Sequence, residues 1–466
     1  MKLKLILTLL FMVFSAFGII SAQDSHYWTN PYGTRGQLVG GVVIGSIVDL
    51  SSTFYNPGAI VKTQDTDLIM STSAFQLTST RVENVFWGNQ DIQSFHFDLA
   101  PDIFAFRFTK KEKKNQFAFS YLTRYYSNLR DNIYQIDQRD VLDWTGGGLD
   151  DFSGFYNGEL RLYEGWGGIS WSRALSDSIG IGITQYIAVR DQHGTFGITA
   201  QAVNPNTLEG GAALFEDKYN YWHVRLLWKA GVLFDYNPLT FGFSLTTPSI
   251  GLFGSGNTFY NRSIINLDIN DDGSPESSLA SNYQDDATVT YRSPLSIGAG
   301  MSYRLGGELG TSVIHISLEW FSGLNEYTVI DTEDFTAQTS GETISNDFAL
   351  ALSPVLNWGI GFEQNFSDSF TMYAAFIKDG SSLAQSNDSR LALNSYDLYH
   401  ISWGSAFSIF RFHITFGLGF GFGSTTDYKL FPIDGLQEGA FPDLETVPVT
   451  YKYRRLLTVI GFAIDF

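Results

Sequence analysis

The sequence predicts an all-β fold, a transmembrane antiparallel β-barrel of about 14 strands. Two patterns carry this prediction. Apolar and polar residues alternate with a period of two from about Leu68 to the last residue, and long and short connections alternate between the resulting strands. A third observation is the 16% aromatic content beside 46 Gly and no Cys, which suits lipid-facing strands better than a disulfide-linked domain.

Composition also excludes several classes of function. Without Cys, the chain has no thiolate nucleophile, no Cys-ligated zinc and no iron–sulfur cluster. The net charge of -19 argues against a nucleic-acid partner, because binding to phosphate backbones relies on Lys and Arg. Neither a Gly-x-Ser-x-Gly nor a His-Glu-x-x-His motif occurs. We therefore expect no enzyme and no cofactor.

Residues 1–22 have the pattern of a Sec signal peptide. Lys2 and Lys4 precede an apolar run from Leu5 to Ile20, and small residues follow up to Ala22. The alternative is a membrane anchor helix, for which the apolar run is short. No later run of about 18 apolar residues occurs. We therefore expect an exported chain that is either soluble or embedded in the outer membrane as a barrel.

Residues 67–466 form the predicted barrel. In 116–125, the side chains of Phe117, Phe119, Tyr121 and Tyr125 are expected on one face, and small or polar side chains on the other. Strands are expected at 68–80, 99–109, 116–127, 158–174, 179–193, 218–236, 239–250, 285–304, 311–326, 354–366, 370–379, 398–407, 411–424 and 451–466.

The connections sort by length. Short turns follow the even-numbered strands, as at 110–115, 237–238, 367–369 and 408–410. Long segments follow the odd-numbered ones, at 81–98, 128–157, 194–217, 251–284, 327–353, 380–397 and 425–450. A soluble β-sandwich has no reason to sort its loops by side, whereas an outer-membrane barrel has short periplasmic turns and long external loops.

Two further features belong to the C-terminal strands. Gly417, Gly419, Gly421 and Gly423 alternate with large apolar residues, so they point to one side and leave room inside the barrel. A phosphate loop is the alternative, but no Lys-Ser/Thr and no helix pattern follow. The chain ends with Phe462, Ile464 and Phe466 on one face, which resembles the terminal strand by which the barrel-assembly machinery recognises outer-membrane barrels.

Negative charge collects in the long segments. They hold 28 of the 48 acidic residues and only 6 of the Lys and Arg residues. We expect an acidic external rim that meets divalent cations and lipopolysaccharide, with ordinary solvated loops as the alternative. Within one loop, Asp268, Asn270 and Asp272, followed by Gly273, match the opening of a calcium loop, although Leu279 stands where the last ligand would be. A flexible acidic loop without calcium is the alternative.

Residues 23–66 do not alternate, and it is a resemblance to a known family that predicts an N-terminal hatch here, which plugs the lumen of the barrel. Asp49, Ser51 and Ser52, followed by Asn56-Pro57 and a small residue, resemble the Asp-x-Ser-Thr…Asn-Pro-Ala-Gly segment in the hatch of the FadL/TodX family of outer-membrane transporters for hydrophobic compounds. We interpret the chain as a member of the Bacteroidetes type. The match is specific over about residues 36–60.

Local chemistry agrees with a compact turn at this motif. Pro57 fixes its own φ and keeps Asn56 extended, and Gly58 turns freely, although the family usually has Ala at that position. Phe54 and Tyr55 are candidates to seal the lumen.

The resemblance implies passive uptake of hydrophobic compounds such as long-chain fatty acids. It also implies a monomer in which the hatch gates ligand release and the ligand leaves sideways through the barrel wall. Such an exit needs a broken ladder, and clustered Gly165, Gly167 and Gly168 in the fourth strand are our candidates for the kink. The family itself points to the third strand.

The alternative function is a barrel of the same family that acts as a docking or scaffold subunit of a protein secretion system, like PorV in Bacteroidetes. An apolar, ligand-sized cavity above Asn56-Pro57 would favour transport. A filled lumen with an exposed aromatic loop patch would favour docking.

Overall fold

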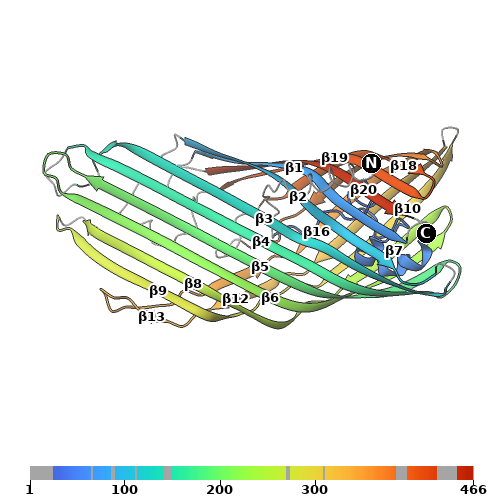
Figure 1. Cartoon of the computed structure of the whole chain (residues 1–466), viewed down its shortest axis with the longest axis horizontal. Coiled ribbons are helices and arrows are strands. Elements are labelled where there is room, and N and C mark those ends of the chain that lie inside the picture. Colours follow the sequence, from blue (N-terminus) through green and yellow to red (C-terminus); the bar gives the residue numbers. More distant parts are fainter. Residues whose placement is uncertain are drawn as a thin grey trace, which may run out of the picture.

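A computed structural model of the chain describes residues 25–63, 67–84, 90–110, 113–140, 142, 148–268, 273–307, 310–384, 396–427 and 449–464. The predicted signal peptide, Asn270, Asp272 and Phe466 lie outside these residues. Within them the backbone forms an elongated antiparallel barrel, with the N-terminal helical segment at one end (Figure 1). No helix in the described part of the chain is long and apolar enough to cross a membrane.

The strands follow the chain in order: β1 (Leu68–Asn84), β2 (Gln90–Arg107), β3 (Asn115–Arg139), β4 (Asp150–Ala174), β5 (Ile179–Val203), β6 (Gly210–Tyr236), β7 (Leu239–Thr246), β8 (Ile250–Leu267), β9 (Glu276–Val289), β10 (Ser296–Gly307), β11 (Gly310–Phe321), β12 (Leu324–Asp331), β13 (Phe335–Thr336), β14 (Thr343–Ile344), β15 (Phe348–Leu352), β16 (Val355–Ser367), β17 (Phe370–Asp379), β18 (Leu398–Ile409), β19 (Phe412–Asp427) and β20 (Val449–Ile464).

Among the described residues these strands make a closed barrel of 14 wall strands, as predicted. Four wall strands are interrupted and consist of β7 with β8, β9 with β10, β11 with β12, and β15 with β16. For example, β6 pairs with β7 at one end and with β8 at the other. β1 pairs with both β2 and β20, which closes the wall.

Several predicted long loops are in fact strand. β4 and β5 each run for 25 residues and stay paired from Asp151↔Val203 to Ala174↔Gly180. At about 3.3 Å per residue such a strand is about 80 Å long, far more than the roughly 25 Å apolar band of a membrane barrel requires. The loop boundaries predicted at 128–157 and 194–217 were therefore wrong. Polar side chains interrupt the apolar alternation on the outside of these extensions, where only a few large apolar residues such as Tyr134, Ile136 and Phe155 are exposed. We call the end where they project the outer end.

A β-bulge changes the predicted faces of β3. Thr123 pairs with Gly165 and Tyr125 with Glu164, so Arg124 is the extra residue. Phe117 and Tyr121 are exposed on the outside, as predicted, but Tyr125 is buried on the inside. The prediction that Tyr125 shares their face was wrong, since one extra residue reverses the alternation.

The C-terminal strands have the predicted faces. Phe416 and Phe422 are exposed to the outside. A Cβ at Gly417 would meet the side chain of Leu38 inside the barrel. In β20, Phe462 stacks on Phe412 with ring centroids 5.6 Å apart.

Candidate functional site

Residues 25–63, which we call the N-terminal segment, lie within the barrel. They include the helix α2 (Ser52–Tyr55) and the 3-10 helix η1 (Pro57–Lys62). The segment bonds to opposite parts of the wall: Thr53 O accepts from Thr184 and Tyr186 of β5, and Leu38 O accepts from Ser402 of β18. The predicted hatch residues Phe54, Tyr55, Asn56, Pro57 and Gly58 are all buried.

The Asn-Pro-Gly turn is fastened to the wall by a single side chain. Asn56 Nδ2 donates to Ile44 O at 2.8 Å and to Val232 O of β6 at 3.0 Å, and its Oδ1 accepts from Gly58 N at 3.1 Å. The wall here is glycine: a Cβ at Gly58 would come within 2.8 Å of backbone oxygens at Gly180 and Gly231. The turn therefore sits directly on the backbone of β5 and β6.

Asp49 organises the inside of the segment. Its Oδ2 accepts from Thr34 Oγ1 and Arg35 N, each at 3.0 Å, and its Oδ1 accepts from Ser51 N at 2.8 Å. Ser51 and Ser52 are buried, and the backbone of Ser51 and Ser52 begins α2. Tyr55 reaches back to accept a hydrogen bond from Tyr32 N at 2.6 Å. The motif residues thus hold the segment together as one folded unit.

Buried wall carboxylates also hold the segment, among them Asp379 and Glu363. Asp379 of β17 accepts from Tyr27 N, Trp28 N and Thr29 Oγ1 at 2.9–3.1 Å. Glu363 of β16 pairs with Arg35 at 2.9 Å. Sequence reasoning missed both, because a lone acidic residue in a strand gives no sign of its partner 300 residues away.

Burial changes the titration of the segment. It lowers the pKa of His26 below the usual value, although Asp379 nearby acts in the opposite direction. It also raises the pKa of Tyr32 to about 12. The Glu363 carboxylate raises the pKa of Arg35. Arg35 is therefore permanently charged, whereas His26 stays neutral at pH 7.

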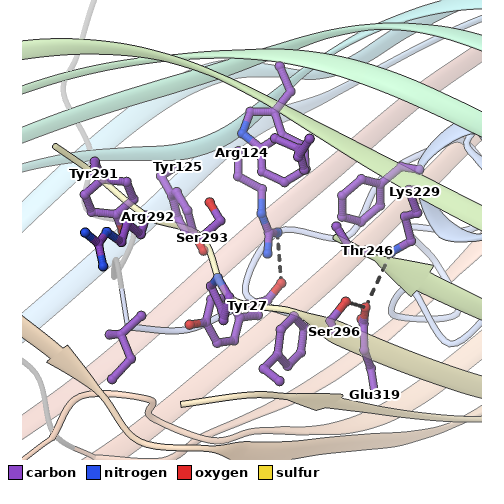
Figure 2. A pocket seen from close by; sticks show the side chains of 16 residues that line it. Tyr27, Arg124, Tyr125, Lys229, Thr246, Tyr291, Arg292, Ser293, Ser296 and Glu319 are labelled. Atoms are coloured by element: carbon purple, nitrogen blue, oxygen red, sulfur yellow. Dashed lines mark hydrogen bonds and ion pairs between the residues drawn. The ribbon is translucent and has the colours of Figure 1, made fainter. Parts of the chain in front are cut away.

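A pocket lies between the N-terminal segment and the wall (Figure 2). Aromatic and aliphatic side chains form most of its surface, with three cations and one carboxylate among them. The free space is about 40 Å³, which holds a few water molecules. The lining residues are Tyr27, Phe54, Arg124, Tyr125, Trp166, Leu227, Lys229, Thr246, Tyr291, Arg292, Ser293, Pro294, Ser296, Glu319, Phe321 and Leu352.

Three of the charged groups of the pocket contact other residues that line it. Figure 2 shows Arg124 directed at Tyr27 and Lys229 directed at Glu319. The Arg124 guanidinium lies 4.9 Å from the Tyr125 ring centroid and 5.5 Å from that of Trp166. Cations over aromatic faces offer an anionic headgroup a partner inside an apolar cavity.

A buried ion cluster lies next to the pocket. Glu164 of β4 pairs with Arg190 at 3.0 Å and Arg225 at 2.5 Å, and all three side chains are fully buried. Tyr291, which lines the pocket, lies with its ring centroid 3.8 Å from the Arg190 guanidinium. This cluster forms the polar boundary of the pocket.

Toward the outer end, apolar side chains fill the part of the lumen beside β4–β6 and β12–β15. Tyr219 of β6 and Phe348 of β15 meet with ring centroids 5.0 Å apart, although their strands are not neighbours. Both belong to a buried apolar cluster that also includes Leu160, Phe196 and Leu350. Nearer the tip, Leu142 packs on Phe152. The described residues therefore show apolar packing across one part of the outer lumen, and the two discriminating features stated above stay predictions.

The wall beside the pocket has a break in its ladder. Within the described residues, β2 and β3 are in register only from Ile103↔Leu122 to Arg107↔Ala118. Toward the outer end, β2 pairs only with β1, and β3 only with β4. The bulged Arg124 and the pocket residue Tyr125 come directly after the last β2–β3 pair.

The irregularity thus belongs to β3 and not to β4, where Gly165, Gly167 and Gly168 predicted it. β4 keeps its register with β5 throughout. Gly165 lies opposite the bulge and has no side chain to fill the space where Tyr121 and Tyr163 bond to one another. The clustered glycines in the sequence therefore indicated the strand opposite the bulge.

Two predicted sites are only partly described. Asp268 accepts a hydrogen bond from Gly273 N at 2.6 Å, while Asn270 and Asp272 lie outside the described residues, so the calcium loop stays a prediction. Phe462 and Ile464 alternate on the outside of β20 as expected, and their role in barrel insertion also stays a prediction.

No protein-family model matches the sequence, and no curated protein matches it. Solved structures do. The Pseudomonas putida toluene transporter TodX aligns with a TM-score of 0.58 at 11% identity, over 94% of this chain and 99% of its own. The fold is that of a FadL-type channel.

Two more structures agree with this assignment of the fold. The Ralstonia pickettii toluene transporter TbuX gives a TM-score of 0.53 at 11% identity, over 94% of this chain and 99% of its own. A Pseudomonas aeruginosa FadL homologue gives 0.52 at 11% identity, over 96% of this chain and 100% of its own. At such low identity the FadL-type likeness concerns the architecture alone.

Proposed function

We propose that the protein is a passive outer-membrane channel for hydrophobic compounds such as long-chain fatty acids, in which the N-terminal segment is the gate. The observation that carries the proposal is the position of the pocket. It lies between the N-terminal segment and the break in the wall, so a ligand in it touches both. The toluene transporters with this fold support a hydrophobic ligand.

The described state is closed. A cavity of about 40 Å³ is too small for an acyl chain or an aromatic ring. Phe54 and Tyr27, which belong to the N-terminal segment, fill the remaining space. A shift of the segment would therefore enlarge the pocket.

The exit we propose runs sideways between β2 and β3. A membrane barrel normally satisfies every backbone group by ladder pairing. Here the pairing of β2 with β3 stops beside Arg124, so a ligand can pass from the pocket into the bilayer without breaking hydrogen bonds between strands. A lateral route keeps a hydrophobic compound out of water.

A docking role is the second candidate, favoured by the apolar cluster that fills part of the outer lumen. Extensions of β3–β6 that are far longer than a membrane requires provide a large surface for a partner protein, as in a PorV-like scaffold. The acidic rim of this surface would meet lipopolysaccharide and divalent cations in the same model.

Uptake of a labelled long-chain fatty acid by cells with and without the protein separates the two functions. A channel gives faster uptake with the protein, and a Pro57→Ala variant alters the rate, since Pro57 fixes the turn that fastens the gate. Equal uptake with and without the protein, for several hydrophobic substrates, would contradict transport.

A further inference from the structure

The outside of the wall is apolar up to a border on the C-terminal strands. In β19, which runs toward the outer end, Phe412, Phe416 and Phe422 are exposed on this side. From Phe412 to Phe422 the strand is about 33 Å long, which at a tilt of about 40° spans about 25 Å along the barrel axis. The apolar band of a membrane barrel has about this height. Phe422 therefore lies at the outer edge of the band.

Basic side chains begin at this edge. Arg454 of β20 is the cross-strand partner of Phe422, and Lys452 lies on the same face, nearer the outer end. Lys452 is in turn the partner of Arg81 in β1, across the seam that closes the barrel. Side chains that face each other across an antiparallel pair have Cβ atoms about 5 Å apart. Arg81, Lys452 and Arg454 therefore form one cluster, which we call the basic patch.

The basic patch is short of negative charge. Glu83 pairs with Lys452 at 2.6 Å and with Arg81 at 3.4 Å. The Arg454 side chain is exposed and has no partner among the described residues. Like charges directly opposite each other destabilise a sheet, so Arg81 and Lys452 favour an anion beside them. This local excess of cations stands in a chain whose net charge is -19.

A hollow of about 700 Å³ adjoins the patch at the outer ends of β18–β20. Its lining combines aromatic rings with hydroxyl and charged groups and includes Tyr399, Phe422, Ser424, Asp397, Lys452 and Arg454. Asp397 is already paired with Lys378 of β17 at 2.8 Å. Tyr399 stacks on Phe422 with ring centroids 5.7 Å apart. A ligand in the hollow meets aromatic rings on the membrane side and cations on the water side.

We propose that the basic patch binds the phosphate group of an outer-leaflet lipid, lipopolysaccharide, on the outside of the barrel. Arg and Lys are the side chains that bind phosphate, through charge-assisted hydrogen bonds. Lipid headgroups lie at the border of the apolar band, so the acyl chains pack on the exposed side chains of Phe422 and Leu456. The inference goes beyond the proposed channel function, because no ligand has to enter the lumen.

This contact differs from the one expected at the acidic rim. Carboxylates meet phosphate through divalent cations, whereas Arg and Lys bind it directly. Binding at the basic patch should therefore persist in EDTA and weaken as the salt concentration rises, since exposed charges are screened. Loss of all binding in EDTA would overturn the inference.

Fluorescence anisotropy of labelled lipopolysaccharide measures the binding, with the protein in neutral detergent micelles and EDTA present. The Lys452→Gln/Arg454→Gln protein should bind more weakly by about tenfold or more. Lys113→Gln/Lys114→Gln removes the same charge from an exposed turn at the opposite end of the barrel and should bind as the wild type does. Equal affinity of the two double variants would overturn the inference.

Glu83→Gln is a variant whose expected effect misfolding cannot imitate. It removes the carboxylate that competes with phosphate for Arg81 and Lys452, so it should bind lipopolysaccharide about threefold more tightly. Unchanged or weaker binding would count against the proposed site.

A last comparison separates a lipid phosphate from free phosphate. Dephosphorylated lipopolysaccharide should bind more weakly by about tenfold or more, because the patch recognises the phosphate. Millimolar inorganic phosphate should leave most of the lipopolysaccharide bound, since it lacks acyl chains to pack on Phe422 and Leu456. Complete displacement by inorganic phosphate at constant ionic strength would assign the patch to free phosphate and refute a lipid site.

Discussion

Replacement of Asn56 by Ala tests how firmly the gate is fastened. The side chain is fully buried and makes three hydrogen bonds, to Ile44 O, Val232 O and Gly58 N. Ala leaves those three backbone groups without this partner. Only the bond to Val232 O joins the segment to the wall, because Ile44 and Gly58 belong to the segment and their bonds to Asn56 are the same in the docked and the detached state. The loss of that bond favours the detached segment by about 1 kcal/mol. Since 1.4 kcal/mol is about tenfold, the detached population should rise about fivefold.

The native chain has no Cys, and Ser52 is buried in α2. The rate at which a maleimide labels a Ser52→Cys protein therefore reports the detached population when detachment is rapid and reversible. Asn56→Ala in that background should label about fivefold faster by the same reasoning. Asn206→Ala, in an exposed turn, is the matched control and should not change the rate. An unchanged labelling rate in a folded Asn56→Ala protein would show that Asn56 does not fasten the gate, and the account of the Asn-Pro-Gly turn would fail.

Three further predictions follow from buried contacts. Gly231→Val should raise Ser52→Cys labelling, because any Cβ there overlaps Asn56 Oδ1, and wild-type labelling in this variant would refute the close approach. Labelling of Ser52→Cys should also rise as the pH falls below about 6.5. The pKa of His26 is lowered while the segment is docked in the barrel, so the detached segment binds more protons and acidification favours detachment. A His26→Gln protein should lose this slope, and a persistent slope would assign it elsewhere. Glu164→Ala should lower the free energy of unfolding in urea by about 3–5 kcal/mol, since it leaves Arg190 and Arg225 buried without their carboxylate. The control Glu159→Ala removes a partly exposed carboxylate and should lower it by less than about 1 kcal/mol. Similar losses in the two variants would count against a stabilising role of the buried cluster.

Alternation and connection length predicted the barrel because both are local properties of the chain. A lipid-facing strand needs an apolar residue at every second position, so the strand cores and the number of wall strands could be predicted. The extensions beyond the membrane could not, because water on one side and a packed lumen on the other remove the simple apolar face. Leu160 and Phe196 lie within or beside predicted loops for this reason.

In the candidate site, too, local features could be predicted from the sequence and long-range contacts could not. The motif around Asn56 could be found because its geometry depends on neighbours in the sequence. The bulge at Arg124 could not, because both Tyr125 and Tyr126 are aromatic, so the sequence shows no break in alternation that would reveal the extra residue. Partners such as Asp379 and Glu319 depend on which strands meet the segment inside the barrel, and only the closed fold determines that.

A reversible tether between the gate and the wall tests the central claim most directly. Val39 lies against β16, where a Cβ at Gly361 would be 3.1 Å from the Val39 Cβ, close to the separation that a disulfide requires. Vesicles that contain the Val39→Cys/Gly361→Cys protein should take up no labelled fatty acid when the protein is oxidised, and uptake should recover on reduction. Oxidation should not change the uptake by vesicles that contain either single variant. Undiminished uptake by the fully oxidised protein would contradict a gate formed by the N-terminal segment.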